Sequence, residues 1–272
     1  MWIPFRKGGH VVSRIRERFK VLTGRGEKAL VAYITGGYPS LEVAGQMVLG
    51  LAECGADIIE IGVPFSDPIA DGPVIQTASY QALQGGVTVA GILEMVQRVR
   101  QQSSIPLVLM SYYNPILQMG LQEFCYQAAR SGVDGLIVPE LPREESLPLL
   151  QAAEQAAIDV VPLVAPASNR ERIAAICARA RGFVYCVSVT GITGEREEIN
   201  TDLASLTGTI RKCTDLPLVI GFGVGNANTA RNLAPLCDGV VVGSALMRLI
   251  IGDSFDRAGE LVREIKSAIN RQ

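Results

Sequence analysis

Residues 59–73 read IEIGVPFSDPIADGP, and this stretch decides how the rest of the chain is interpreted. It begins as an apolar strand that holds one carboxylate, Glu60, and continues as a loop that holds Asp71 and is stiffened by prolines. An ionised carboxylate in a buried strand costs several kcal/mol unless it is paired or its pKa is shifted. The stretch therefore predicts a strand that ends in a functional loop, as at the mouth of a barrel enzyme.

Short apolar runs recur on both sides of this stretch, with segments of helical period between them. Strands are expected at residues 29–34, 57–62, 106–111, 135–138, 160–164, 183–187, 217–221 and 239–242. Near-continuous apolar strands indicate burial on both faces, which is typical of parallel sheets. Eight strand–helix repeats fit a closed (β/α)8 barrel or an open doubly wound sheet, and their regular spacing favours the single (β/α)8 TIM barrel.

The helical segments are predicted from caps and from apolar periodicity. Ser40 and Thr88 are expected to cap helices at residues 41–54 and 89–102, and residues 255–269 predict a final amphipathic helix. A short helix is expected at 244–249, and an extra N-terminal helix is expected to cover the base of the barrel, with Val11, Val12, Ile15, Phe19 and Leu22 at helical spacing. No linker is visible, so residues 1–272 are expected to form one domain.

Composition excludes several classes of protein. With 48% hydrophobic and 19% charged residues, the chain can bury a large core. A formal net charge of -2 without blocks of like charge gives no support for nucleic-acid binding. Neither a signal peptide nor a run of eighteen apolar residues is apparent, so no membrane association and a cytoplasmic location are expected. The six scattered cysteines are interpreted as free thiols in a reducing compartment.

The chemistry must use groups other than histidine. His10 is the single histidine, which leaves almost no material for a multi-histidine metal site or a serine–histidine–acid triad. Glu60 and Asp71 offer two carboxylates in one mouth that could divide acid and base work. From the residues alone, Glu60 could instead form a buried ion pair, and Asp71 with Gly72 could simply start the helix expected at residues 74–83.

Glycine-rich loops follow the last three predicted strands, at residues 191–194, 221–225 and 243–244. Barrel enzymes frequently bind phosphate with the loops after strands seven and eight and the N-terminus of a short extra helix. Tight strand-to-helix turns are the competing explanation for these glycines. Three such loops at one side of a barrel favour a phosphate-carrying ligand. The charged residues 195–198 suggest a mobile lid, with a solvated surface loop as the competing interpretation.

From about Ala29 to Leu249 the chain resembles the alpha subunit family of tryptophan synthase. The resemblance rests on the segment from Glu60 to Pro73, supported by the sequences at 112–115 (YYNP), 132–135 (GVDG), 190–194 (TGITG) and 221–223 (GFG). It implies a lyase that cleaves indole-3-glycerol phosphate into indole and glyceraldehyde-3-phosphate by a reverse aldol reaction, without cofactor or metal. Glu60 would be the mobile acid and base, and Asp71 would accept the indole N–H.

The resemblance also implies the binding residues and the partner. The indole pocket would be lined by Tyr33, Tyr112, Leu163, Tyr185, Thr193 and Phe222, and the phosphate would be held by Gly194, Gly223, Gly243 and Ser244. Ordinary core packing competes for each apolar member. The family works with a beta subunit that carries pyridoxal phosphate, in an alpha2-beta2 heterotetramer, and Pro64, Asp67, Asn114 and the loop at 139–142 are candidate contacts.

Three departures from the family pattern fall near the barrel mouth. Glu140 stands where the family usually has Asp, Tyr38 replaces a frequent Asp, and Asn226-Ala227-Asn228 replaces a commoner helix start. None of them falls on Glu60 or Asp71. A free-standing indole-glycerol phosphate lyase, a phosphate-binding barrel isomerase and a barrel that only binds a ligand or partner remain the alternatives.

Overall fold

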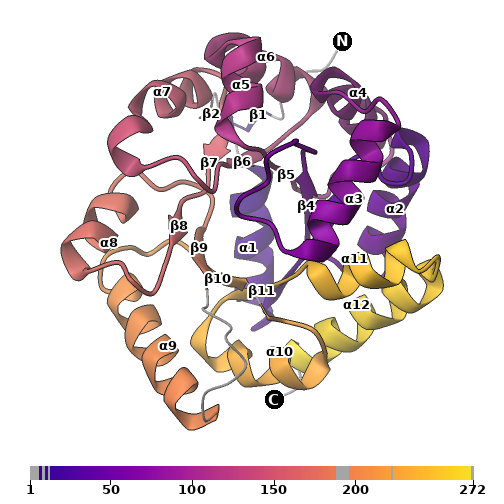
Figure 1. Ribbon diagram of the computed structural model, residues 1–272. Helices are drawn as coiled ribbons and strands as arrows, with labels where there is room; N and C mark the ends of the chain where they lie inside the picture. The colour runs from indigo at the N-terminus through magenta and orange to yellow at the C-terminus, as the bar shows by residue number, and fades with distance from the viewer. Residues whose placement is uncertain (1–5, 8–9, 12, 188–195, 222, 271–272) are drawn as a thin grey trace.

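Among the described residues, nine parallel strands form one sheet that curls around on itself, with helices outside it (Figure 1). This computed structural model describes residues 6–7, 10–11, 13–187, 196–221 and 223–270. The strands of the sheet are β3 (Ala29–Thr35), β4 (Ile58–Gly62), β5 (Leu107–Met110), β6 (Gly135–Ile137), β7 (Asp159–Val160), β8 (Leu163–Val164), β9 (Val184–Val187), β10 (Leu218–Gly221) and β11 (Gly239–Val242).

The sheet closes through the fifth predicted strand, which is divided into two short pieces. β7 pairs with β6, whereas β8 pairs with β9, so the two pieces occupy the two ends of the strand order. Only Val161 and Pro162 separate them, and the ladder continues because Val161 N donates to Leu136 O at 2.9 Å and Tyr185 N donates to Pro162 O at 3.0 Å. The barrel prediction is confirmed, and the open sheet is excluded because the two pieces of this strand leave no unpaired edge in the sheet that the described residues form.

Helices surround the sheet, and all but α1 lie outside it. They are α1 (Arg14–Gly24), α2 (Leu41–Glu53), α3 (Pro73–Gln84), α4 (Val89–Arg100), α5 (Tyr113–Met119), α6 (Leu121–Ser131), α7 (Leu147–Gln155), α8 (Arg170–Cys177), α9 (Arg196–Arg211), α10 (Ala227–Leu233), α11 (Ser244–Ile251) and α12 (Phe255–Asn270), with 3-10 turns η1 (Arg143–Glu145) and η2 (Ala234–Leu236). The predicted caps are confirmed, since Ser40 Oγ accepts from Val43 N at 3.2 Å and Thr88 Oγ1 accepts from Gly91 N at 3.1 Å.

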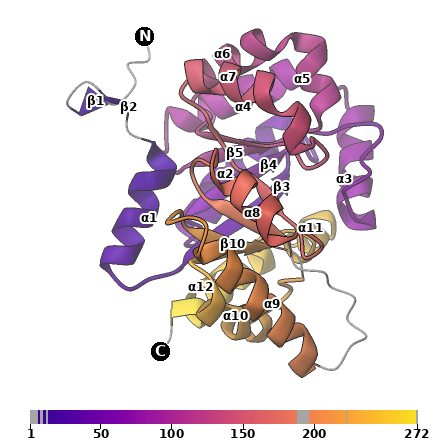
Figure 2. The same ribbon diagram turned by 90° about the vertical axis from the view of Figure 1, so that its left-hand side faces the viewer.

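Helix α1 covers the base of the barrel, opposite the end at which α3 lies (Figure 2). Ile15, Phe19 and Leu22 are buried against inward-facing side chains of the strands, as expected. The prediction that the helix includes Val11 is wrong: Ser13 is the N-cap, and Val11 lies in β2 (His10–Val11), which pairs with β1 (Arg6–Lys7) in a small hairpin. Val12 lies outside the described residues.

A repeated aspartate fixes pairs of strands at this base. The residue directly before β4, β6 and β11 accepts a backbone N–H from the preceding strand in the sheet, which satisfies a donor that would otherwise be buried unpaired. The pairs are Asp57 with Leu30 at 2.7 Å, Asp134 with Leu107 at 2.9 Å and Asp238 with Leu218 at 2.8 Å.

All three aspartates also anchor helices, since Asp238 pairs with Arg211 of α9 at 3.1 Å. Asp57 is fully buried and binds Arg18 of α1 at 2.5 Å and Lys266 of α12 at 2.9 Å. Asp134 binds Arg14 and Arg100 at 2.6 and 2.9 Å. The charged end of the barrel is therefore a structural network, which leaves the opposite end for chemistry.

Candidate active site

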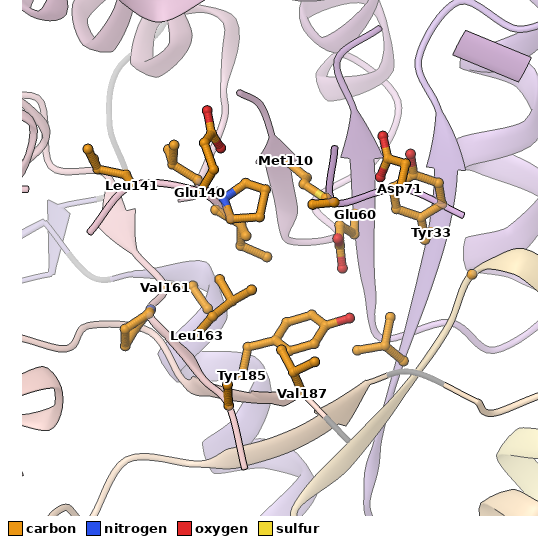
Figure 3. Close-up of a pocket in the computed structure, with 18 of the residues that line it drawn as sticks. Tyr33, Glu60, Asp71, Met110, Glu140, Leu141, Val161, Leu163, Tyr185 and Val187 are labelled. Atoms are coloured by element: carbon orange, nitrogen blue, oxygen red, sulfur yellow. The ribbon is translucent and has the colours of Figure 1, made fainter. Parts of the chain in front are cut away.

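A cleft of about 1220 Å³ opens at the C-terminal ends of the strands (Figure 3). It brings together most of the residues predicted from the sequence, namely Tyr33, Glu60, Asp71, Leu163, Tyr185, Gly223, Gly243 and Ser244. Tyr112 is not among the residues that line the cleft, but its side chain hydrogen-bonds Asp71. Thr193, Gly194 and Phe222 lie outside the described residues. Of the predicted lid, Glu195 also lies outside them, whereas residues 196–198 form the start of α9 rather than a loop. Residues far apart in the chain thus meet because parallel strands end together at one rim.

Glu60 is the buried carboxylate of the cleft. It lies in β4, where it pairs with Tyr33 of β3 and Val108 of β5, and its residue is only 2% exposed. Within the described part of the chain its Oε2 has no hydrogen-bond partner, and Figure 3 shows the carboxylate pointing toward the hydroxyl of Tyr185. Burial, reinforced by the charge of Asp71, raises the pKa of Glu60 to about 8. The ion-pair alternative therefore has no cation to support it in the described residues.

Asp71 approaches the same cleft from the loop after β4. Gly72 is the N-cap of α3 and Pro73 its first residue, so the helix start expected here does exist, yet the Asp71 side chain lines the cleft. Burial raises the pKa of Asp71 to about 6; hydrogen bonding to Tyr112 opposes this rise and the charge of Glu140 adds to it. The two carboxylates thus differ in pKa because one is enclosed and the other is half-buried beside a phenol.

Tyr112 fixes the Asp71 loop to the next barrel strand. Its hydroxyl oxygen accepts a hydrogen bond from Ala70 N at 2.9 Å, one residue before Asp71. Its ring packs against Phe65 with centroids 5.2 Å apart. Burial, with the charge of Asp71, raises the pKa of Tyr112, so the phenol keeps its proton and can donate it. Tyr112 therefore contacts the loop that carries Asp71 at two places, at Phe65 near its start and at Ala70 near its end.

The cleft ends at the N-terminus of α11. Gly243 is the N-cap of this helix, Ser244 is its exposed first residue, and Gly223 adopts a φ of +82° in the loop after β10. The first N–H groups of a helix have no acceptor within the helix and carry its positive dipole end. Gly223, Gly243 and Ser244 thus border a place where backbone donors can hold an anion.

Several lining residues were missed at the sequence level. Met110, Ile137 and Val187 form part of the inner wall, and Arg248 of α11 reaches the cleft. Met110, Ile137 and Val187 each lie at or near the C-terminal end of a predicted strand, a position that would have identified them. No comparable pattern in the sequence indicates that Arg248 reaches the cleft, because its position depends on how α11 packs against β11.

The proposed partner-contact residues differ in exposure. Asp67 and Asn114 are exposed, whereas Pro64 is buried within the chain itself. Of the departures, Asn226 caps α10 by accepting from Thr229 N at 2.9 Å, so it replaces the commoner helix start without loss of a cap. Glu140 lines the cleft and its Oε1 accepts from Tyr113 N at 2.5 Å.

Three further properties bear on the sequence predictions. All six cysteines are free. Across the described ranges, no helix has the length and apolarity needed to cross a membrane. In the same residues no group of three or more His, Cys, Asp and Glu side chains is arranged to hold a metal ion.

Comparison with known proteins gives a consistent result. The family model for the tryptophan synthase alpha chain matches residues 19–271. The chain is 44% identical over 259 residues to a tryptophan synthase alpha chain of Thermoanaerobacter sp. (strain X514), covering 95% of this chain and 98% of the relative. It is 47% identical to that of Carboxydothermus hydrogenoformans, over 88% of this chain and 90% of the relative. The crystal structure of the alpha chain from Legionella pneumophila subsp. pneumophila superposes with a TM-score of 0.88 at 32% identity, covering 95% of this chain and 98% of that one.

Proposed function

The chain belongs to the tryptophan synthase alpha chain family, a family of carbon–carbon lyases that cleave indole-3-glycerol phosphate, and we propose that Glu60 and Asp71 divide the chemistry of that cleavage between them. The observation that carries this proposal is the pair itself. Two carboxylates line one cleft with pKa values of about 8 and about 6, so near neutral pH one holds a proton while the other is charged.

Glu60 moves the protons. Its acid form delivers a proton to C3 of the indole ring, which converts the ring into an electron sink. The resulting carboxylate then removes the proton of the glycerol hydroxyl, the carbon–carbon bond breaks, and its electron pair returns to the ring. Glyceraldehyde-3-phosphate and indole leave, and Glu60 ends the cycle protonated as it began. The absence of a hydrogen-bond partner for its Oε2 among the described residues supports this role, because no described donor opposes its movement between the two sites.

Asp71 stabilises the charge that develops on the ring. Protonation at C3 places positive charge on the ring nitrogen, and a carboxylate that accepts this N–H binds the transition state more tightly than the ground state. Because Tyr112 holds the preceding residue through Ala70 N, the Asp71 carboxylate is fixed before the charge appears. The free-energy cost of orienting the Asp71 carboxylate therefore arises during folding and not during the reaction.

The remaining residues hold the substrate. Tyr33, Leu163 and Tyr185 border the cleft around Glu60 and supply the apolar walls for indole, and Tyr112, Thr193 and Phe222 are proposed to complete them. Gly223, Gly243 and Ser244 lie where the phosphate would meet the N-terminus of α11, with Gly194 assigned to the same group from the sequence resemblance. In this proposal the scissile carbon–carbon bond lies between the carboxylates and the phosphate end.

Membership of the family implies a beta-subunit partner, and an alpha2-beta2 assembly is proposed for this chain. Asp67 and Asn114 are exposed near the mouth and are the proposed contacts; Pro64, being buried, would shape the loop that presents Asp67. Pyridoxal phosphate would belong to the beta chain. The alpha reaction as written requires no cofactor or metal, and residues 1–272 are proposed to act as one barrel domain.

A turnover assay on indole-3-glycerol phosphate, with indole as the readout, tests these roles. Glu60→Gln and Asp71→Asn are each expected to lower kcat at least ~100-fold while the circular dichroism spectrum stays unchanged. Glu145→Gln is the matched control, because Glu145 is exposed on η1 and lies outside the cleft. Retained turnover in Glu60→Gln would refute the assignment. High turnover that added beta subunit does not stimulate would instead favour the free-standing lyase, and absence of indole release would favour an isomerase or a binding barrel.

A further inference from the structure

Two carboxylate oxygens in the described part of the chain are buried without a hydrogen-bond partner, and both belong to residues of the same cleft. They are Oε2 of Glu60 and Oε2 of Glu140. An unsatisfied buried acceptor destabilises the folded state, and more so when it is charged. The mechanism proposed above uses Glu60 but gives no role to Glu140, so the second cost has no explanation in the chemistry described so far.

Glu140 is connected to Asp71 through a short series of contacts. Its Oε1 accepts from Tyr113 N at 2.5 Å and so holds the first residue of α5, whose N-cap Tyr112 has no side-chain cap of its own. The neighbouring Tyr112 hydroxyl accepts from Ala70 N at 2.9 Å, directly before Asp71. These two hydrogen bonds connect the loops after β4, β5 and β6, and the series of contacts ends next to the Asp71 carboxylate.

The connection is electrostatic as well as mechanical. Four ionisable groups interact with Asp71: Glu60 in β4, Tyr33 in β3, Tyr112 at the start of α5, and Glu140 after β6. After burial, the Tyr112 hydrogen bond lowers the pKa of Asp71 and the charge of Glu140 raises it. No cation acts on Asp71 in this set. Glu140 is therefore a negative charge near the place where the ring nitrogen becomes positive.

We propose that Glu140 is a positioning residue of this active site: it binds Tyr113 N at the start of α5 and so holds Tyr112 and the Asp71 loop in place, and its unpaired oxygen keeps negative charge near Asp71. The inference rests on the proposed function of Asp71 as the acceptor of the indole N–H. A carboxylate repelled by a nearby like charge is a stronger hydrogen-bond acceptor, because its pKa is higher. Glu140 therefore strengthens the bond that Asp71 makes to the charged ring without touching the substrate.

Two substitutions separate the mechanical from the electrostatic role. Glu140→Gln keeps the volume and a carbonyl oxygen for Tyr113 N but removes the charge, whereas Glu140→Ala removes both. We expect Glu140→Gln to shift the acid limb of the kcat/KM profile down by roughly half a pH unit and to lower kcat about threefold, with KM nearly unchanged. Glu140→Ala is expected to lower kcat about tenfold or more through movement of Tyr112. Glu140→Asp restores the charge and is expected to rescue the pH profile. Glu145→Gln again serves as the control.

A titration independent of turnover completes the test. The carboxyl carbon of Asp71 is followed by NMR of the 13C-labelled protein, with Asp71→Asn used to assign its signal. A lower Asp71 pKa in Glu140→Gln supports the proposal even if the chain cleaves a different substrate. An unchanged Asp71 titration in Glu140→Gln would overturn the electrostatic role, and wild-type kcat in Glu140→Ala would overturn the mechanical one. If turnover on indole-3-glycerol phosphate is absent in the wild type, the function proposed above fails while this titration still gives an answer.

Discussion

The hydroxyl of Tyr33 lies directly over Gly62 of the neighbouring strand, where a Cβ would come within 2.1 Å of the phenol oxygen. The same arrangement recurs across the barrel, where a Cβ at Gly221 would lie 2.1 Å from the hydroxyl of Tyr185. Gly62 pairs with Thr35, which lies two residues after Tyr33 on β3. In the same way Gly221 pairs with Val187, which lies two residues after Tyr185 on β9. The two aromatic walls around Glu60 therefore depend on the absence of a side chain on the adjacent strand.

Gly62→Ala is expected to displace the Tyr33 ring and to lower kcat/KM at least ~10-fold, with a stability loss of about 1–3 kcal/mol from overpacking. Indole release and urea denaturation measure the two effects. Gly208→Ala in α9 is the matched control, because a Cβ there meets nothing within 4 Å. Alanine replaces glycine favourably inside a helix, so this control should keep full activity and gain up to about 1 kcal/mol. Unchanged activity in Gly62→Ala would show that the Tyr33 position does not matter.

A plot of kcat/KM against pH should be bell-shaped. In the proposed mechanism Asp71 is ionised, so its pKa of about 6 would set the acid limb. Glu60 begins the cycle protonated, so its pKa of about 8 would set the basic limb. The kcat/KM of the free enzyme is therefore expected to be highest between pH 6 and 8 and to fall on either side. A profile that continued to rise above pH 9 would contradict the use of Glu60 as an acid.

Glu60 should also make the stability depend on pH. Its folded pKa of about 8 lies above the ordinary value of 4.5, so the folded protein keeps a proton that the unfolded chain releases between these pH values. The free energy of unfolding should therefore fall as pH rises through this range. Glu60→Gln lacks this titration, so its stability relative to wild type should increase from pH 5 to pH 8 by a few kcal/mol. Denaturant midpoints at several pH values measure the difference, and parallel curves would argue against a raised pKa.

Tyr112→Phe removes the hydroxyl that bonds Ala70 N and interacts with Asp71. Since that hydrogen bonding lowers the pKa of Asp71, its loss should move the acid limb of the kcat/KM profile to higher pH. The direction is opposite to that expected for Glu140→Gln. Tyr126→Phe is a control, because Tyr126 is exposed on α6 and its ring stacks with Arg130 instead. A downward shift in Tyr112→Phe would refute this account of the Asp71 environment.

Asp57→Ala should destabilise the base of the barrel without touching the cleft. It would leave Arg18, Lys266 and the Leu30 N–H without their common acceptor, and removal of one member of a buried network typically costs about 3–5 kcal/mol. Urea denaturation measures this loss. Glu154→Gln breaks the exposed pair with Arg181 and should cost less than about 1 kcal/mol. Equal effects of the two substitutions would contradict a structural role for the buried aspartate.

Much of the architecture was predictable because it depends on neighbours in the chain. The apolar runs place each predicted strand within a few residues of its observed position, and Ser40 and Thr88 begin α2 and α4 as expected. The N-terminal helix was placed too early, because apolar spacing alone could not distinguish Val11 in a hairpin from a first helical turn. The fifth strand was predicted as one piece, and pairing with both neighbours divides it.

The sequence by itself predicted the barrel, the family and the candidate carboxylates Glu60 and Asp71, since strand periodicity and the motif around these two residues are local properties of the chain. Only the tertiary structure decided how these carboxylates differ. The raised pKa of Glu60 arises from burial and from the charge of Asp71, and the connection from Glu140 to Asp71 passes through residues of three separate loops. Desolvation and electrostatic repulsion depend on the atoms that folding brings close, which a linear pattern does not record.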